Sequence, residues 1–205
     1  MISEIFSATL QILIFAFIPF LFFIIKNKKA KGFLNFIGLS KSSTKANFFA
    51  FLISLTLAVP VLLLAVWNDD FREIMIHPQS ATGKIRALGF STETMVVVMI
   101  AAIFKTAFSE ELLFRGFIAK RLIAITNYQI GNVVQAIIFG GIHTLLFAFI
   151  TQNIVFLTVI FIFPSLVAYF QVYLNEKLAN GSIIPGWIAH GTANVISYSF
   201  IGFLI

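Results

Sequence analysis

The stretch IFSATLQILIFAFIPFLFFII, residues 5–25, is followed directly by KNKKAK, residues 26–31. The first stretch has no charged residue and has about the length that an α-helix needs to cross the hydrocarbon core of a bilayer. The second carries four lysines. An apolar run that ends in a lysine cluster is typical of a transmembrane helix with its basic end in the cytoplasm. This stretch therefore predicts a membrane-spanning chain.

The whole chain has the same character, because 60% of its 205 residues are hydrophobic, 11% are charged and its mean hydropathy is +1.00. These values lie far from those of soluble domains. The apolar windows are continuous rather than alternating, which favours helices over a barrel. We predict an all-α, polytopic membrane helical bundle that forms one integral membrane domain, residues 1–205. Its six expected spans are about 5–25, 47–67, 94–118, 132–150, 154–174 and 183–205.

The net charge of +6 comes largely from one connection, residues 26–45, called here the basic connection; it holds six of the fourteen lysines and arginines. This bias predicts that the basic connection is cytoplasmic and that both termini lie outside. A lipid-headgroup site there is the alternative, and nucleic acid is not an expected partner. The polar interval 68–91 is expected to be an extracytoplasmic loop. Cysteine is absent from the sequence, so chemistry must come from carboxylates, histidines or hydroxyls.

The third window contains Glu110, Glu111 and Arg115, although a charged residue at mid-membrane costs roughly 2.5–3.5 kcal/mol. Glu111 and Arg115 are spaced i,i+4 and can form an ion pair on one helix face. Glu110 is rotated away and is the freer carboxylate. A purely structural ion-pair cluster is the alternative interpretation.

Two further windows carry intramembrane histidines. His143 follows Phe139 by four residues with two glycines between them, while His190 and Asn194 share one polar helix stripe with Ser197. Such a stripe must face the protein interior rather than lipid. Each histidine alone is equally consistent with a hydrogen-bonded packing network.

The depths of these residues favour a single site. Glu110 lies ten residues before Lys120, His143 lies eleven after Asn132 and His190 lies eight after Ser182. At 1.5 Å per residue, all three lie about 12–17 Å from the predicted cytoplasmic side. We therefore expect them to converge in one site that opens toward that side.

Two chemistries remain open for this site. Glu110 can act as the general base for a hydrolytic water, with Asn194 and one histidine as donors to an oxyanion. Alternatively, Glu110, His143 and His190 are a three-ligand set for catalytic Zn²⁺. The sequence does not distinguish a metal-bound water from a metal-free one.

At these residues the sequence resembles the CPBP family, the CAAX proteases and bacteriocin-processing enzymes also called the Abi family. Its motifs EExxxR, FxxxH and HxxxN are present as Glu110-Glu111-xxx-Arg115, Phe139-xxx-His143 and His190-xxx-Asn194. The resemblance covers about residues 92–205, whereas the two N-terminal spans match only in being hydrophobic. It implies an intramembrane endopeptidase in which Glu110 and His143 activate water, the third motif stabilises the oxyanion, and Glu111, Arg115 and Phe139 support them. The family is described as metalloproteases, although a metal-free glutamate mechanism is also argued for its CAAX-cleaving members.

The expected function of this chain is the hydrolysis of a peptide bond. The chain itself is expected to be a multi-pass protein of the cell membrane. Its partner would be a membrane-associated substrate: a prenylated C-terminus, a leader or pheromone peptide, or a membrane protein segment. The first alternative is a non-catalytic scaffold or bacteriocin-immunity protein of the same fold. The second is a small proton-coupled transporter that uses the same ionisable residues as a relay.

Overall fold

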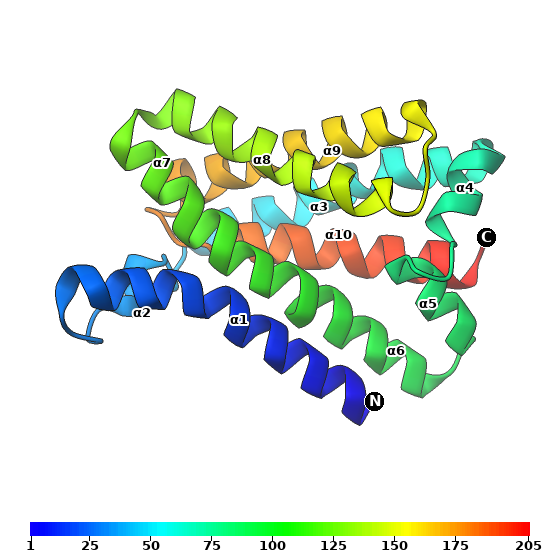
Figure 1. The fold of residues 1–205 in the computed structure, drawn as a ribbon, viewed down its shortest axis with the longest axis horizontal. Helices are drawn as coiled ribbons and strands as arrows, with labels where there is room; N and C mark the ends of the chain where they lie inside the picture. Colours follow the sequence, from blue (N-terminus) through cyan, green and yellow to red (C-terminus); the bar gives the residue numbers. More distant parts are fainter.

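Helices follow one another along the computed structural model, which describes residues 1–205 except for the side chain of Leu57; the described residues form no strand. Each predicted window corresponds to a long helix, although 132–150 and 183–205 extend one or two residues past the helix ends. The long helices are α1 (Ile2–Asn27), α3 (Thr44–Trp67), a continuous helix of α6 (Thr92–Met99), η1 (Ile100–Phe108), η2 (Glu111–Ala119) and α7 (Lys120–Ile125), then α8 (Tyr128–Ala148), α9 (Ile154–Tyr173) extended by η3 (Leu174–Leu178), and α10 (Ile184–Phe203) (Figure 1).

The all-α membrane bundle is confirmed, although the count of six spans is not. Four helices are long and apolar enough to cross a membrane, namely α1, α3, α8 and α9 with η3. The other two predicted spans, 94–118 and 183–205, correspond to helix 92–125 and α10, which carry all the polar residues singled out in the sequence except His143 of α8. That these two also cross the membrane stays a prediction.

The prediction of a loop over 68–91 was wrong, because this interval folds into α4 (Asp69–Met75) and α5 (Ala81–Leu88). The side chain of Asn68 accepts a hydrogen bond from Phe71 N, and that of Ser80 accepts one from Gly83 N. Such N-caps satisfy the free amides of the first helical turn. Burial of Phe71 and Ile85 then fastens both short helices to the bundle.

The ends of the helices lie at two opposite ends of the bundle. Both termini lie at one end of the bundle with α4, α5 and the α8–α9 connection, and the basic connection lies at the other end with the start of α10 (Figure 1). That connection contains α2 (Phe33–Phe36) and is fastened to the α10 start by a hydrogen bond from Ile183 N to Gly38 O. This agrees with the predicted alternation of helix directions.

Glycine permits the closest contact between α8 and α9. A Cβ atom added at Gly140 would overlap Ser165 Oγ and Phe161 O of α9, whereas one added at Gly141 would meet nothing within 4 Å. Small residues allow helix backbones to approach in this way. Gly140 therefore sets the distance between α8, which carries His143, and α9.

We expect Gly140→Ala to destabilise the protein by about 1–3 kcal/mol, because the added methyl group overpacks the α8–α9 contact. Gly141→Ala is the matched control: it should leave stability unchanged or raise it by up to about 1 kcal/mol, since alanine favours helix. Thermal unfolding in detergent measures both. Equal effects of the two variants would contradict the close-packing role of Gly140.

Candidate active site

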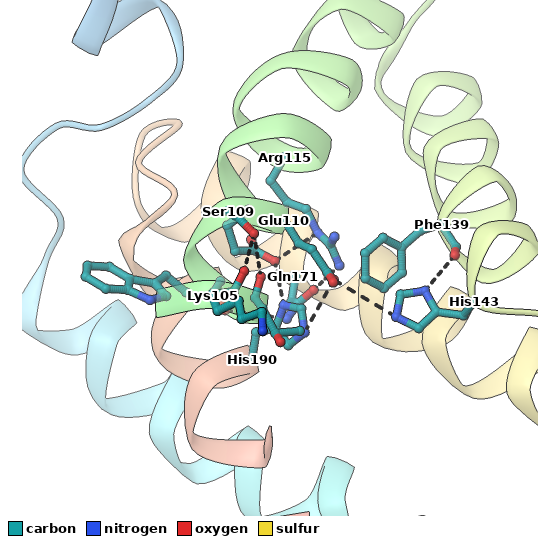
Figure 2. A network of polar contacts seen from close by, with 12 residues as sticks. Lys105, Ser109, Glu110, Arg115, Phe139, His143, Gln171 and His190 are labelled. Atoms are coloured by element: carbon teal, nitrogen blue, oxygen red, sulfur yellow. Dashed lines mark hydrogen bonds and ion pairs between the residues drawn. The ribbon is translucent and has the colours of Figure 1, made fainter. Parts of the chain in front are cut away.

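Glu110, His143 and His190 meet at one point in the bundle, as the sequence predicts. Glu110 Oε2 lies 3.8 Å from His190 Nε2 and 4.0 Å from His143 Nε2 (Figure 2). The three residues come from the 92–125 helix, α8 and α10. Residues far apart in the chain thus form one cluster of ionisable groups.

Glu110 lies between two π-helical stretches, η1 and η2. Such i→i+5 segments are rare and occur mostly at functional sites. Apolar periodicity does not reveal a π-helix, so this feature was not predicted. The Glu111–Arg115 contact forms although both residues are in a π-helix, since Arg115 Nε lies 3.2 Å from Glu111 Oε1. The predicted ion pair is confirmed.

This ion pair is almost completely removed from solvent, because the side chains of Glu111 and Arg115 are 0% and 1% exposed. Arg115 Nη2 donates a hydrogen bond to Gln171 Oε1 on α9, and the guanidinium lies over the Phe139 ring, 4.0 Å from its centroid. Phe139 therefore contacts the site as predicted. Gln171 was missed: it is a single polar residue near the end of an apolar window, and no motif marks it.

Hydrogen bonds fix the orientation of both histidine rings. His143 Nδ1 lies 2.9 Å from Phe139 O, and His190 Nδ1 lies 3.2 Å from Glu111 Oε1. A carbonyl oxygen and a carboxylate paired with arginine can only accept, so each Nδ1 carries a hydrogen. In the neutral rings, both Nε2 atoms are then acceptors, and both face Glu110.

Asn194 lies beside this cluster and shares a cavity with it. The cavity, about 500 Å³ in volume, is lined by Glu110, His143, His190, Asn194 and Ser197, among mainly apolar side chains. Asn194 Nδ2 is buried and has no hydrogen-bond partner among the described residues, and the same is true of Glu110 Oε2. The site thus combines an unpaired acceptor with an unpaired donor.

The expected opening of this site toward the basic connection was wrong. The cavity extends instead to the other end of the bundle, where Gln79, Thr82 and Ile150 line it. The depth estimate also used Asn132 as a surface marker, whereas Asn132 is 0% exposed and donates to Tyr169 O. Counting residues gives the depth of a side chain but not the direction in which space is left free.

A set of six side chains closes the site toward the basic connection, and we call it the polar–aromatic layer. None of its members is more than 5% exposed: Glu111, Phe114, Arg115, Phe139, Gln171 and Asn175. Asn175 Oδ1 accepts a hydrogen bond from Gly186 N, 2.8 Å away, at the start of α10. The layer joins helix 92–125 to α8, α9 with η3, and α10.

The three converging residues have donors that suit zinc, because each histidine donates through Nδ1 and leaves Nε2 free, the usual pattern of zinc-bound histidines. The distances from Glu110 Oε2 to the two histidine Nε2 atoms are longer than the distances between ligand atoms in a zinc-bound site. Ligands 2.0–2.1 Å from a tetrahedral zinc ion lie roughly 3.3 Å apart, against 3.8 and 4.0 Å here. Accordingly, the described residues include no ready-made cluster of three metal ligands.

Comparison with known families gives a match for the second half of the chain. The sequence profile of the type II CAAX prenyl endopeptidase Rce1-like family matches residues 92–196. The chain belongs to the Rce1-like family. The matched residues contain helix 92–125, α8, α9 and the part of α10 that carries His190 and Asn194, so every predicted site residue lies within the Rce1-like match. No curated protein and no solved structure matches the chain.

We expect Gln171→Ala to lower stability by about 1.5–3 kcal/mol, because it removes a hydrogen bond to the buried charge of Arg115. Gln152→Ala is the matched control, since Gln152 is exposed and bonds only to Ala148 O in the turn before it. It should change stability by less than about 0.5 kcal/mol. Thermal unfolding of both variants in detergent tests this; a Gln171→Ala protein as stable as Gln152→Ala would show that the layer does not depend on Gln171.

Proposed function

We propose that this membrane protein of the Rce1-like family is an endopeptidase that cleaves a membrane-associated peptide or protein within the cell membrane. One observation carries the proposal. Three acceptors, Glu110 Oε2 and the Nε2 atoms of His143 and His190, face one another in a buried cavity. Such a group is complementary to a molecule that supplies hydrogens, and water is the reactant that hydrolysis needs.

The proposed reaction begins with a water molecule that donates one hydrogen to Glu110 and the other to the Nε2 atom of His143 or His190, because one water has two hydrogens. Glu110 takes a proton from this water as its oxygen attacks the carbonyl carbon of the substrate peptide bond. A tetrahedral intermediate forms, and its C–N bond breaks as Glu110 returns the proton to the leaving amine. The products are a new carboxyl end and a new amine end.

Asn194 is the proposed oxyanion donor, because its buried Nδ2 lacks a partner among the described residues and lines the same cavity. A donor in place before the reaction stabilises negative charge without reorganisation. The family resemblance implies the same role for His190. Since His190 Nδ1 donates to Glu111, its neutral ring presents an acceptor at Nε2; we therefore assign His190 to holding the water.

The alternative for the same residues is a zinc-dependent version, in which Glu110, His143 and His190 hold the ion. Zinc would polarise the peptide carbonyl and favour deprotonation of water. The Nδ1 contacts of both histidines support this version, while the 3.8 and 4.0 Å separations require the side chains to move closer together. The role of the Glu111–Arg115 pair in orienting His190 is the same in both versions.

We expect Glu110→Gln, His143→Ala and His190→Ala each to lower peptide cleavage at least about 100-fold, the smaller end of a general-base contribution. The readout is the membrane peptidome of cells that carry the active protein, compared with cells that carry each variant. Peptides that require all three residues identify the substrate at the same time.

Two matched controls lie outside the site: Glu73→Gln on α4 and His77→Ala, which replaces the third histidine of the chain. Both should process the same peptides as the unaltered protein. Identical peptidomes for the three site variants and the unaltered protein would refute hydrolysis and favour a scaffold or immunity role.

The zinc version predicts that the purified protein contains about one zinc ion per chain and that His143→Ala and His190→Ala lose it, since each removes one of three ligands. Elemental analysis of protein washed in a weak chelator measures this without an activity assay. Full cleavage activity of zinc-free protein would exclude the zinc version and support the glutamate mechanism.

A further inference from the structure

Two cavities reach Glu110. The cavity that contains Asn194 continues past Ser197 and ends at the α4–α5 turn, where exposed Gln79 forms part of its rim. A second cavity, of about 480 Å³, reaches Glu110 and His143 from the side, between α1 and α8. On α1 it is lined by residues from Ser7 to Phe15, that is, from the first turns to the middle of this helix.

The opposite side of Glu110 is closed by the polar–aromatic layer. Phe139 bounds the first cavity and Phe114 bounds the second. Behind them, Arg115 and Gln171 occupy the space between the helices, at 1% and 0% exposure. Loss of one partner from a buried charged network leaves an uncompensated charge and is strongly destabilising. A route through this layer would therefore require its polar contacts to break.

The charge of the chain gives this asymmetry a direction relative to the membrane. The basic connection lies at the closed end of the bundle and holds six lysines, which places it on the cytoplasmic side. The open end carries both termini, α4 and α5. The first cavity therefore approaches Glu110 from the extracytoplasmic half of the bundle, whereas the second reaches it laterally, between α1 and α8.

We propose that the site takes its substrate from the membrane face opposite the basic connection. On the basis of the proposed peptidase function, the substrate is then an exported peptide or an extracytoplasmic segment of a membrane protein. A prenylated C-terminus presented from the cytosol would meet the closed layer. Among the three substrate classes that the sequence leaves open, the cavity thus disfavours the first.

The size of the cavity adds a condition on the substrate. One turn of helix, with side chains, is about 10–12 Å wide and 5.4 Å tall, so it fills roughly 400–600 Å³. The cavity of about 500 Å³ holds about that much chain. The cavity therefore admits about one helical turn of a substrate at a time, and the Ser197 hydroxyl lines it.

The absence of cysteine from the sequence makes the direction of access measurable. Three full-length variants, each with one cysteine, are expressed in membranes: Ser197→Cys within the cavity, Gln79→Cys at its rim, and Lys29→Cys in the basic connection. A charged, membrane-impermeant methanethiosulfonate is applied to intact cells and to inverted vesicles. Thiols left unmodified are then counted with a maleimide mass tag after denaturation.

We expect the reagent to block Ser197→Cys and Gln79→Cys in intact cells and Lys29→Cys only in inverted vesicles. Modification of Ser197→Cys from the side that modifies Lys29→Cys, or from neither side, would overturn the proposed access. Modification of Lys29→Cys in intact cells would reverse the orientation and overturn the substrate assignment.

This labelling does not depend on catalysis, so it is separate from the test of the peptidase. Loss of cleavage in the Glu110, His143 and His190 variants concerns the reaction, whereas the modified cysteine concerns the direction of access. Once a substrate peptide is identified, the same reagent applied to intact cells should stop its cleavage by Ser197→Cys and leave the cysteine-free protein active. Continued cleavage by fully modified Ser197→Cys would contradict substrate binding in this cavity.

Discussion

The buried ion pair between Glu111 and Arg115 constrains the rest of the structure. The two side chains are 0% and 1% exposed, in a part of the bundle where lipid offers no hydrogen bonds. Their remaining polar groups must be met by other helices, or the cost is several kcal/mol. Gln171 of α9, the Phe139 ring of α8 and His190 of α10 supply part of these contacts, while Glu111 Oε2 and Arg115 Nη1 have no hydrogen-bond partner among the described residues. One pair on one helix therefore determines how three others are placed.

The same pair connects structure to the proposed chemistry through one residue. Glu111 accepts from His190 Nδ1 and thereby turns His190 Nε2 toward Glu110. The contact needs α10 to approach closely, and a Cβ atom at Gly186 would overlap Glu111 Oε2 and the Asn175 side chain. The adjacent carboxylates thus differ: Glu111 Oε1 forms an ion pair with Arg115, while Glu110 Oε2 has no hydrogen-bond partner among the described residues and faces the two histidines.

The sequence predicted those parts of the fold and site that follow from apolar length and helical spacing. Continuous windows predicted the helices, and the i,i+4 spacing predicted the Glu111–Arg115 pair. The sequence did not predict that Gln171 and Asn175 belong to the site, because a polar residue near the end of an apolar window also suits a membrane interface. Only tertiary packing shows that they are buried. The charged composition of residues 68–91 predicts a loop. The sequence does not show that Phe71 and Ile85 are buried, because their burial depends on contact with the bundle.

The direction of access could not follow from the sequence for a related reason. Glu110 lies 18 residues from the start of helix 92–125 and 15 from its end, or roughly 27 and 22 Å along the axis, so its depth favours neither face. Side-chain volume decides instead. Toward the basic connection the neighbours are large and mutually bonded, with Arg115 fixed between Phe139 and Gln171. Toward the other face a cavity remains, lined by the small residues Thr106, Ala193 and Ser197 together with larger apolar ones such as Phe147 and Phe163. A site near the middle of helix 92–125 thus has its free space toward one end of the bundle, and that space depends on which helices become neighbours.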